Sequence, residues 1–202
     1  MLVLASALLG GCGGGDATPS ASSTGSAAED STAAPSSDGG TGDETAGDGT
    51  TDVPPFPANA EPDTADASAD SRGTVRDIRL GGHDGFDRVV FEVGGAGTPG
   101  WDVRYVDSAS SQGSGEPIDV AGDAILQVTL TGMGIPPDTG VEEYSAPDPL
   151  SVAGTHVVTE VPFDATFEGT TVTFVGTSGE LPFRVYQLQN PVRVVLEVAS
   201  SG

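Results

Sequence analysis

The feature that most constrains the fold is a two-residue alternation of apolar and polar side chains, which recurs in short runs from Thr74 onward. Side chains of a β-strand point alternately to opposite faces, so this period predicts strands with one buried face. Gly, Pro, Asp or Asn bounds each run, and no window of about ten residues has apolar side chains at helical spacing. Strands are predicted at Val75–Leu80, Arg88–Val93, Trp101–Val106, Ile125–Leu130, Val157–Val161, Thr171–Val175, Phe183–Leu188 and Val192–Val198.

The patterned segment spans about 130 residues, which is enough to build one hydrophobic core. Short strands in this number, about eight or nine, are typical of a β-sandwich or a β-barrel. One irregular stretch, Thr131 to Thr155, is long for a loop inside a compact domain, and it is either a functional connection or a surface excursion. We therefore predict one all-β domain over residues 72–202.

Two segments, Arg88–Val93 and Arg193–Val198, share the pattern Arg-Val-Val-apolar-Glu-Val. In each, a turn precedes an arginine that begins a strand with alternating faces. We predict a duplicated half, with one such strand in each sheet of a sandwich. Each arginine is expected near a carboxylate, for which Asp87 and Glu197 are the local candidates.

The composition changes sharply at about Ser71. Residues 13–71 consist mainly of Gly, Ala, Ser, Thr, Pro, Asp and Glu, with Phe56 as the one aromatic residue and no basic residue. Such a stretch buries too little apolar surface to offset the entropy of ordering it, so residues 12–71 are predicted to form a disordered acidic tether. The net charge of −23 and the absence of lysine argue against nucleic acid as a partner.

Cys12 is the one cysteine of the chain, and it closes the string Leu9-Gly10-Gly11-Cys12 after a short apolar run. This string resembles a bacterial lipobox, which implies a lipoprotein signal peptide in residues 1–11 and a diacylglyceryl group on Cys12. No Lys or Arg precedes the run, although the first part of a signal peptide, the n-region, is normally basic. We therefore expect this n-region to be incomplete. The alternative is a free cysteine in a Gly-rich tail. The run is shorter than the roughly 20 residues that span a membrane, so we expect lipid anchoring at the extracytoplasmic face of the cell membrane.

The segment Val75–Val198 resembles the AMIN-like domain of actinobacterial lipoproteins, a distant relative of the AMIN domains attached to cell-wall amidases and secretins. The resemblance implies a single β-sandwich, an envelope location and attachment to peptidoglycan, and it implies no catalytic residues. The string from His83 to Arg88 is its most specific piece. The matching strings are Gly82–Glu92, Trp101–Val106, Gly113–Pro117, Pro182–Tyr186 and Arg193–Val198.

The best candidate for a site is the connection His83-Asp84-Gly85-Phe86-Asp87-Arg88, because polar groups and a ring converge on one loop of a rigid scaffold. We single out His83, Asp84, Asp87 and Arg88 as ligand-binding residues. The structural alternative is a tight turn at Asp84-Gly85, with Asp87 paired to a neighbouring arginine.

Trp101 and Tyr105 are candidates for contact with a sugar, because ring faces pack on sugar faces. They are four residues apart on one predicted strand and therefore share a face. The alternative is that both rings belong to the core.

The sequence contains little that indicates a catalytic or cofactor-binding motif. The string from Gly95 to Gly100 fits G-x-G-x-x-G, but a strand rather than a helix follows it, so we predict a hairpin loop and no nucleotide site. The two histidines, His83 and His156, are scattered, and no G-x-S-x-G elbow occurs. We predict no catalytic residue, no metal site and no cofactor.

These observations predict a lipid-anchored protein of the cell envelope that binds peptidoglycan or cell-wall glycan without catalysis. The alternative is an interaction module that recruits a wall hydrolase or a secretion component.

Overall fold

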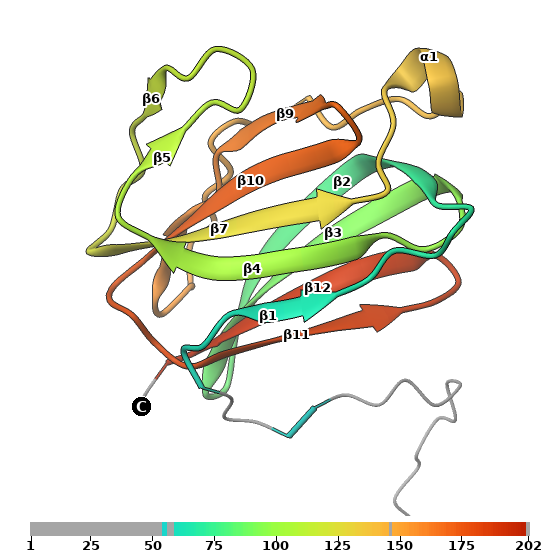
Figure 1. Ribbon diagram of the computed structural model, residues 1–202. Coiled ribbons are helices and arrows are strands. Elements are labelled where there is room, and N and C mark those ends of the chain that lie inside the picture. The colour runs from blue at the N-terminus through green and yellow to red at the C-terminus, as the bar shows by residue number, and fades with distance from the viewer. Residues whose placement is uncertain (1–53, 56–58, 146, 201–202) are drawn as a thin grey trace, which may run out of the picture. The chain divides into compact units, whose positions relative to one another are not determined.

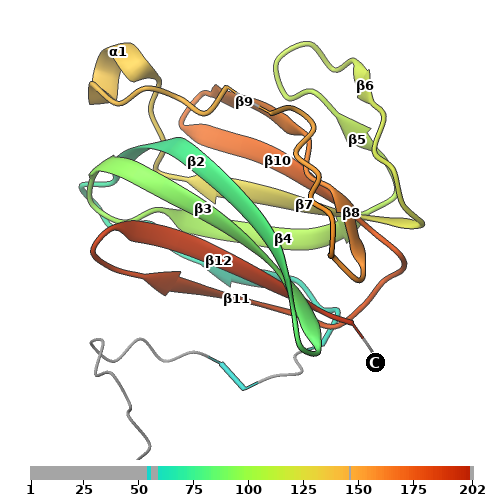
Figure 2. The ribbon, with the colours of Figure 1, turned by 180° about the vertical axis from the view of Figure 1, so that it is seen from behind.

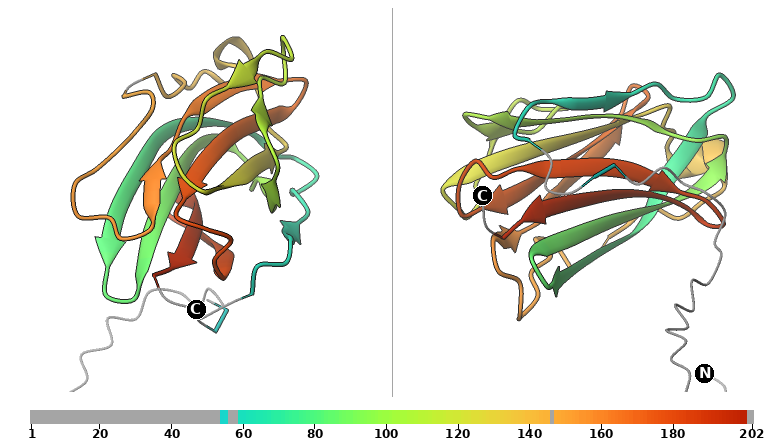
Figure 3. Two further views of the ribbon diagram at one scale, coloured as in Figure 1. Left: turned by 90° about the vertical axis from the view of Figure 1, so that its left-hand side faces the viewer. Right: turned by 90° about the horizontal axis from the view of Figure 1, so that it is seen from below.

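The computed structural model describes residues 54–55, 59–145 and 147–200, all within the unit Gly47–Gly202. Two antiparallel sheets lie face to face in two layers, which Figure 1 shows from one side and Figure 3 from two further directions. The predicted all-β sandwich is therefore confirmed. Cys12, the predicted signal peptide and residues 13–53 of the predicted tether lie outside the described residues. Within the described part of the chain, no helix has the length and apolar content needed to cross a membrane.

One layer is a six-stranded antiparallel sheet in the order β1-β4-β7-β10. The second edge of β10 pairs with two short strands, β8 and β9, and a register irregularity marks each of these pairings. The strands are β1 (Asp63–Ala65), β4 (Gly100–Val106), β7 (Ala124–Thr131), β8 (Val158–Glu160), β9 (Phe163–Phe167) and β10 (Thr170–Thr177).

The other layer is a four-stranded antiparallel sheet in the order β11-β12-β3-β2, seen in front in Figure 2. Two hairpins build it. The β2–β3 turn contains Gly85 at a φ of 85°, a conformation that glycine adopts without a steric penalty. The strands are β2 (Arg72–His83), β3 (Phe86–Ala96), β11 (Phe183–Leu188) and β12 (Val192–Ala199).

The strands β3 and β12, which carry the repeated Arg-Val-Val pattern, are antiparallel neighbours in this one sheet. Arg88 lies opposite Glu197, and Glu92 lies opposite Arg193. The prediction of one such strand in each sheet is therefore wrong. Its physical reason is that the pattern is complementary to itself when read antiparallel, because the arginine at its first position faces the glutamate at its fifth.

The main strands follow the predicted runs, whereas the shortest elements were not predicted. They have two to five residues each, too few to show a periodic pattern, and most are stabilised by pairing to a neighbour. The hairpin of β5 and β6 covers the outside of the six-stranded sheet, where Ala109 and Ile118 pack with Val172 and Phe174. The unpredicted elements are β1, β5 (Ala109–Ser110), β6 (Pro117–Ile118), β9 and the helix α1 (Pro136–Thr139).

Strand β1 lies before Arg72, where the change in composition placed the start of the domain. Asp63 to Ala65 pair with β4, and the Asp63 carboxylate accepts a hydrogen bond of 2.8 Å from Nε1 of Trp101. The sheet therefore begins inside the segment predicted to be a tether. Backbone pairing at a sheet edge needs little apolar content, which explains why composition did not reveal it.

The segment from Gly95 to Gly100 joins β3 to β4, which belong to different sheets. It is therefore a crossover between the layers, and the predicted hairpin loop is wrong. The prediction took the two strands as partners because they are close in sequence, but β3 pairs with β2 and β12 on its two edges.

The irregular stretch after β7 runs along the free edge of β2. The amide of Gly134 donates to the carbonyl of Gly73 at 2.7 Å, and the amide of Tyr144 donates to the carbonyl of Val75 at 2.8 Å. A free edge exposes unpaired backbone groups and invites pairing with other chains. The stretch therefore has a structural role in covering this edge.

The core lies between the two layers, and both sheets contribute apolar side chains to it. Asp87 also faces this side of β3 and has no solvent exposure. Its Oδ2 accepts hydrogen bonds from the amides of His156, Val157 and Val158 at 2.7–2.8 Å. Fully buried side chains of the core include Val75, Val89, Phe91, Val103, Leu126, Val161, Val194 and Leu196.

Asp87 thus attaches the segment before β8 to the start of β3, and its loss is expected to destabilise the fold. Asp87→Ala leaves three amides without their acceptor, so the free energy of unfolding should fall by about 3 kcal/mol or more. Asp87→Asn keeps one acceptor oxygen and should lose less. Urea denaturation measures both, with the exposed Asp119→Ala as a control within about 0.5 kcal/mol of the parent. Equal stability of Asp87→Ala and the control would contradict this role.

Candidate functional site

The outer face of the four-stranded sheet is the side turned away from the six-stranded sheet, and it is the side toward the viewer in Figure 2. The register places side chains from all four strands in rows across this face. One row contains Gly81, Arg88, Glu197 and Arg184, and the next contains Arg79, Val90, Val195 and Tyr186.

A glutamate without solvent exposure lies in the first row. We call Glu197 with Arg88, Arg184 and Tyr186 the Glu197 cluster. Oε1 of Glu197 accepts hydrogen bonds from Nε of Arg88 at 2.8 Å and from the hydroxyl of Tyr186 at 2.9 Å. Its Oε2 accepts from Nε of Arg184 at 2.5 Å. The two strands β3 and β11 thus contribute donors to one carboxylate on β12, which lies between them.

A second carboxylate of this face also lies between two arginines. Glu92 on β3 accepts hydrogen bonds from Nε of Arg76 at 2.7 Å and from Nη2 of Arg79 at 3.0 Å, and these three residues form the Glu92 cluster. Arg76 reaches this face because a register shift interrupts β2 between Val75 and Asp77. Arg79 also donates to Asp77 at 2.6 Å.

Both carboxyls are held in the ionised form. Hydrogen bonding from Arg76 is the main cause that lowers the pKa of Glu92, and Arg79 adds to it, while burial opposes it. For Glu197 burial is the largest influence and raises the pKa. The hydrogen bonds from Arg88, Arg184 and Tyr186 outweigh burial together, so the pKa of Glu197 is lowered. Burial, with Glu197 beside the hydroxyl, raises the pKa of Tyr186 and keeps its donor proton in place.

An aromatic stack lies at the hairpin end of the face. The rings of His83 and Phe86 stack with centroids 5.0 Å apart and planes inclined by 15°. The guanidinium of Arg88 lies 5.3 Å from the Phe86 ring centre, a cation–π distance. His83 is exposed and Phe86 is half-buried, so this end presents ring surface to solvent.

The outer face collects basic residues in an acidic protein. Five of the seven arginines of the chain project onto it, against three carboxylates, whereas the whole chain has a net charge of −23. The arginines are Arg76, Arg79, Arg88, Arg184 and Arg193, and the carboxylates are Asp77, Glu92 and Glu197.

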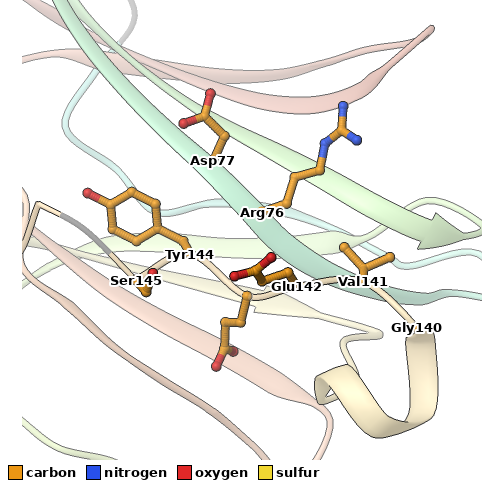
Figure 4. Close-up of a pocket in the computed structure, with 8 residues that line it drawn as sticks. Arg76, Asp77, Gly140, Val141, Glu142, Tyr144 and Ser145 are labelled. Carbon is orange, nitrogen blue, oxygen red and sulfur yellow. The ribbon is translucent and has the colours of Figure 1, made fainter. Parts of the chain in front are cut away.

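A hollow adjoins this face at the edge of β2 that the stretch after β7 covers. Its volume is about 580 Å³, and it lies between β2 and the segment Gly140–Ser145. Figure 4 shows Tyr144 and Ser145 toward one end of the hollow and Val141 toward the other. Arg76 and Asp77, which belong to the outer face, also line it. The hollow therefore extends the charged face around the edge of the sheet.

The structure brings together only part of the predicted site. His83 and Arg88 lie on the outer face, and Asp84 is exposed in the hairpin turn beside them. Asp87 points to the opposite side and is buried, so it is a structural residue and does not contact a ligand there. It pairs with backbone amides rather than with the arginines that were its expected partners.

Trp101 and Tyr105 do share a face of β4, and that face is turned to the core. Their partners across β7 are Leu130 and Leu126, both buried. The hydroxyl of Tyr105 donates to the carbonyl of Leu181 and accepts from its amide, each at 2.8 Å. Burial raises the pKa of Tyr105. The two rings therefore help to form the core and do not join His83 and Arg88.

Six residues of the two clusters were not singled out as site residues from the sequence. The repeated motif identified Glu197 as a partner for an arginine, but not as part of a site. The alternation along β11 places Arg184 and Tyr186 on one side, a signal that was present in the sequence. The register shift in β2 left no such signal for Arg76, whereas Arg79 alternates with the inward-facing Ile78 and Leu80. The six are Arg76, Arg79, Glu92, Arg184, Tyr186 and Glu197.

Among the residues that the structure describes, no group of three or more His, Cys, Asp or Glu side chains is arranged to hold a metal ion.

The model of the AMIN-like domain matches residues 73–200. The chain belongs to the AMIN-like domain family. The matched region begins in β2 and ends directly after β12, so it contains both sheets except β1. No curated protein and no solved structure matches the chain.

The two lowered pKa values predict a loss of stability in acid. The folded-state pKa of Glu92 and of Glu197 lies below the usual value of 4.5. Their contribution is therefore complete above about pH 4.5 and is lost as the pH falls through the lowered values. Between about pH 6 and pH 3, the free energy of unfolding should fall less steeply in Glu92→Gln and Glu197→Gln than in the parent. The exposed Glu116→Gln is the control, and a pH profile unchanged in all three variants would contradict the prediction.

Proposed function

We propose that this protein is a lipid-anchored component of the cell envelope whose AMIN-like domain binds peptidoglycan or cell-wall glycan through the outer face of the four-stranded sheet. The observation that carries the proposal is the gathering of five arginines and an exposed aromatic stack on one sheet face of an acidic protein.

The chemistry of the face suits a wall polymer. Peptide-bearing glycans present carboxylates along chains of sugar rings. Guanidinium groups bind carboxylates with paired, charge-assisted hydrogen bonds, and ring faces pack on the apolar faces of sugars. Arg88 and Phe86 place both kinds of group side by side.

The two buried carboxylates of the face support a binding role rather than a catalytic one. A general acid at neutral pH needs a pKa raised toward the working pH. The pKa values of Glu92 and Glu197 are instead lowered, and arginines occupy both oxygens of each carboxylate.

The proposed anchor is the lipid on Cys12, with residues 13–53 as the tether. A segment of this length has a contour reach of about 140 Å. Acidic residues at intervals favour extension by mutual repulsion. The AMIN-like domain would then reach wall polymers at a distance from the membrane surface.

The wall-binding proposal predicts that two arginines of the outer face matter and that an arginine elsewhere does not. Arg79→Gln combined with Arg193→Gln removes two charges while Arg76 still neutralises Glu92. Sedimentation with purified, protein-free sacculi should show affinity lowered about tenfold. Arg104→Gln is the matched control, because Arg104 is exposed and pairs with Asp102 on the other sheet.

Equal binding by the double variant and the parent would contradict the assignment of this face. Absence of binding by the parent itself would favour the alternative, an interaction module that recruits a wall hydrolase or secretion component.

The anchoring proposal has its own test. Cys12→Ser removes the thiol that accepts the lipid, so the protein should leave the membrane fraction and partition into the aqueous phase of a detergent separation. Cys12→Ala should behave in the same way, whereas Ser22→Ala in the predicted tether should remain in the detergent phase. Detergent-phase recovery of Cys12→Ser equal to that of the parent would contradict lipidation.

A further inference from the structure

The Glu92 cluster and the Glu197 cluster have a similar arrangement of charges, although their arginines come from different strands. Each contains a carboxylate from the repeated Arg-Val-Val-apolar-Glu-Val motif, and in each that carboxylate lies between two arginines. Each glutamate occupies the fifth position of its motif. The antiparallel pairing of β3 with β12 relates the two positions by a local two-fold axis through the Val90–Val195 pair.

The register fixes the separation of the two clusters. Glu197 lies opposite Arg88, and Arg88 is four residues from Glu92 along β3. With a rise of about 3.4 Å per residue and neighbouring strands about 4.8 Å apart, the two glutamates are about 14 Å apart across the face. Val90 and Val195 lie between them, and Val90 is half-buried whereas Val195 is buried, so a position without charge separates the two charged ones.

Each cluster contains guanidinium donors beyond those that its glutamate uses. Arg88 directs Nε and Nη2 to Glu197, and Arg76 directs the same two groups to Glu92. For both arginines, Nη1 has no hydrogen-bond partner among residues 54–55, 59–145 and 147–200. The side chains of Arg76 and Arg79 are 50 % exposed and that of Arg88 is 34 % exposed.

The glutamates also hold these arginines in place. An exposed arginine loses rotamer freedom when it binds an anion, and this loss weakens binding. Here the ion pairs fix the guanidinium planes before any ligand arrives. At the Glu197 cluster, two arginines surround one carboxylate. At the Glu92 cluster, Arg79 also pairs with Asp77, and Arg193 opposite Glu92 supplies the excess positive charge that attracts a further anion. A buried glutamate adds little to stability that an apolar residue could not provide, so this arrangement fits recognition better than stability.

We infer that the outer face binds two oxyanion groups of one polymer at the same time, one at each cluster, with an uncharged stretch of the polymer passing over Val90 between them. The inference rests on the proposed function and deepens it by naming the groups recognised. Carboxylates of wall peptides and phosphates of wall phosphodiester polymers share this chemistry. Occupancy of one cluster raises the effective concentration of the next anion at the other, so the two sites reinforce one another.

A double-mutant cycle on the two clusters tests simultaneous binding. Arg79→Gln and Arg88→Gln each remove one guanidinium, while Arg76 still neutralises Glu92 and Arg184 and Tyr186 still bind Glu197. The probes are poly-L-glutamate for carboxylates and inorganic polyphosphate for phosphates, titrated into the full chain by calorimetry. Each single variant should lose at least about tenfold in affinity for the preferred probe, and the double variant less than about threefold more.

Losses that multiply in the double variant, or a loss from only one cluster, would overturn simultaneous binding. Arg88→Lys keeps the charge and should retain more affinity than Arg88→Gln, and circular dichroism verifies that each variant is folded. If Arg88→Gln does not fold, the pair Arg79→Gln and Arg88→Lys replaces it in the cycle, with the same two outcomes.

Chemically altered sacculi separate this inference from the proposed function. Amidation of the wall carboxylates, removal of the phosphodiester polymers, or both together should abolish binding, and the effective treatment identifies the source of the anions. Binding that survives both treatments together would overturn the inference and leave wall binding intact. The opposite result is that the protein does not bind native sacculi, while the double-mutant cycle on the soluble probes is non-additive. This result would overturn wall binding and leave the inference intact.

Discussion

The burial of Glu197 is the constraint on which the outer face depends. A carboxylate without solvent exposure destabilises the fold by several kcal/mol unless it is paired, and here β3 and β11 supply the groups that pair it. These groups meet only in one register. A slip of β12 by one residue would turn Glu197 toward the core and away from Arg88 and Arg184. The ion pairs therefore specify the alignment of three strands as well as the charge of the surface.

The strands were predictable because alternation is a local property of the sequence. Their partners were not, because nothing local distinguishes a strand of one sheet from a strand of the other. The crossover from Gly95 to Gly100 shows this limit, since it separates two strands that adjacency in sequence would pair. The short strand β1 shows another, because its stability comes from hydrogen bonds to β4 and not from its own composition.

The candidate site was likewise predictable only in part from the sequence. The alternation of side chains already indicated that Asp87 shares its face of the strand with the apolar Val89 and Phe91. It also indicated that Trp101 and Tyr105 lie on the face opposite to charged residues. Following this alternation along the whole strand would have predicted that these three side chains point to the core. No local signal places Arg76 beside Glu92, because that contact depends on the register shift in β2.

The repeated motif of β3 and β12 is complementary to itself when two copies pair antiparallel. Position one then lies opposite position five, position two opposite position four, and position three opposite position three. A strand with this property has the same complementarity toward a copy from another molecule as toward its partner in the same chain. The fold places both copies in the interior of the sheet, with β11 and β2 on either side, so that neither has an open edge. Partial unfolding that detached a flanking hairpin strand would expose a surface already suited to strand exchange between molecules.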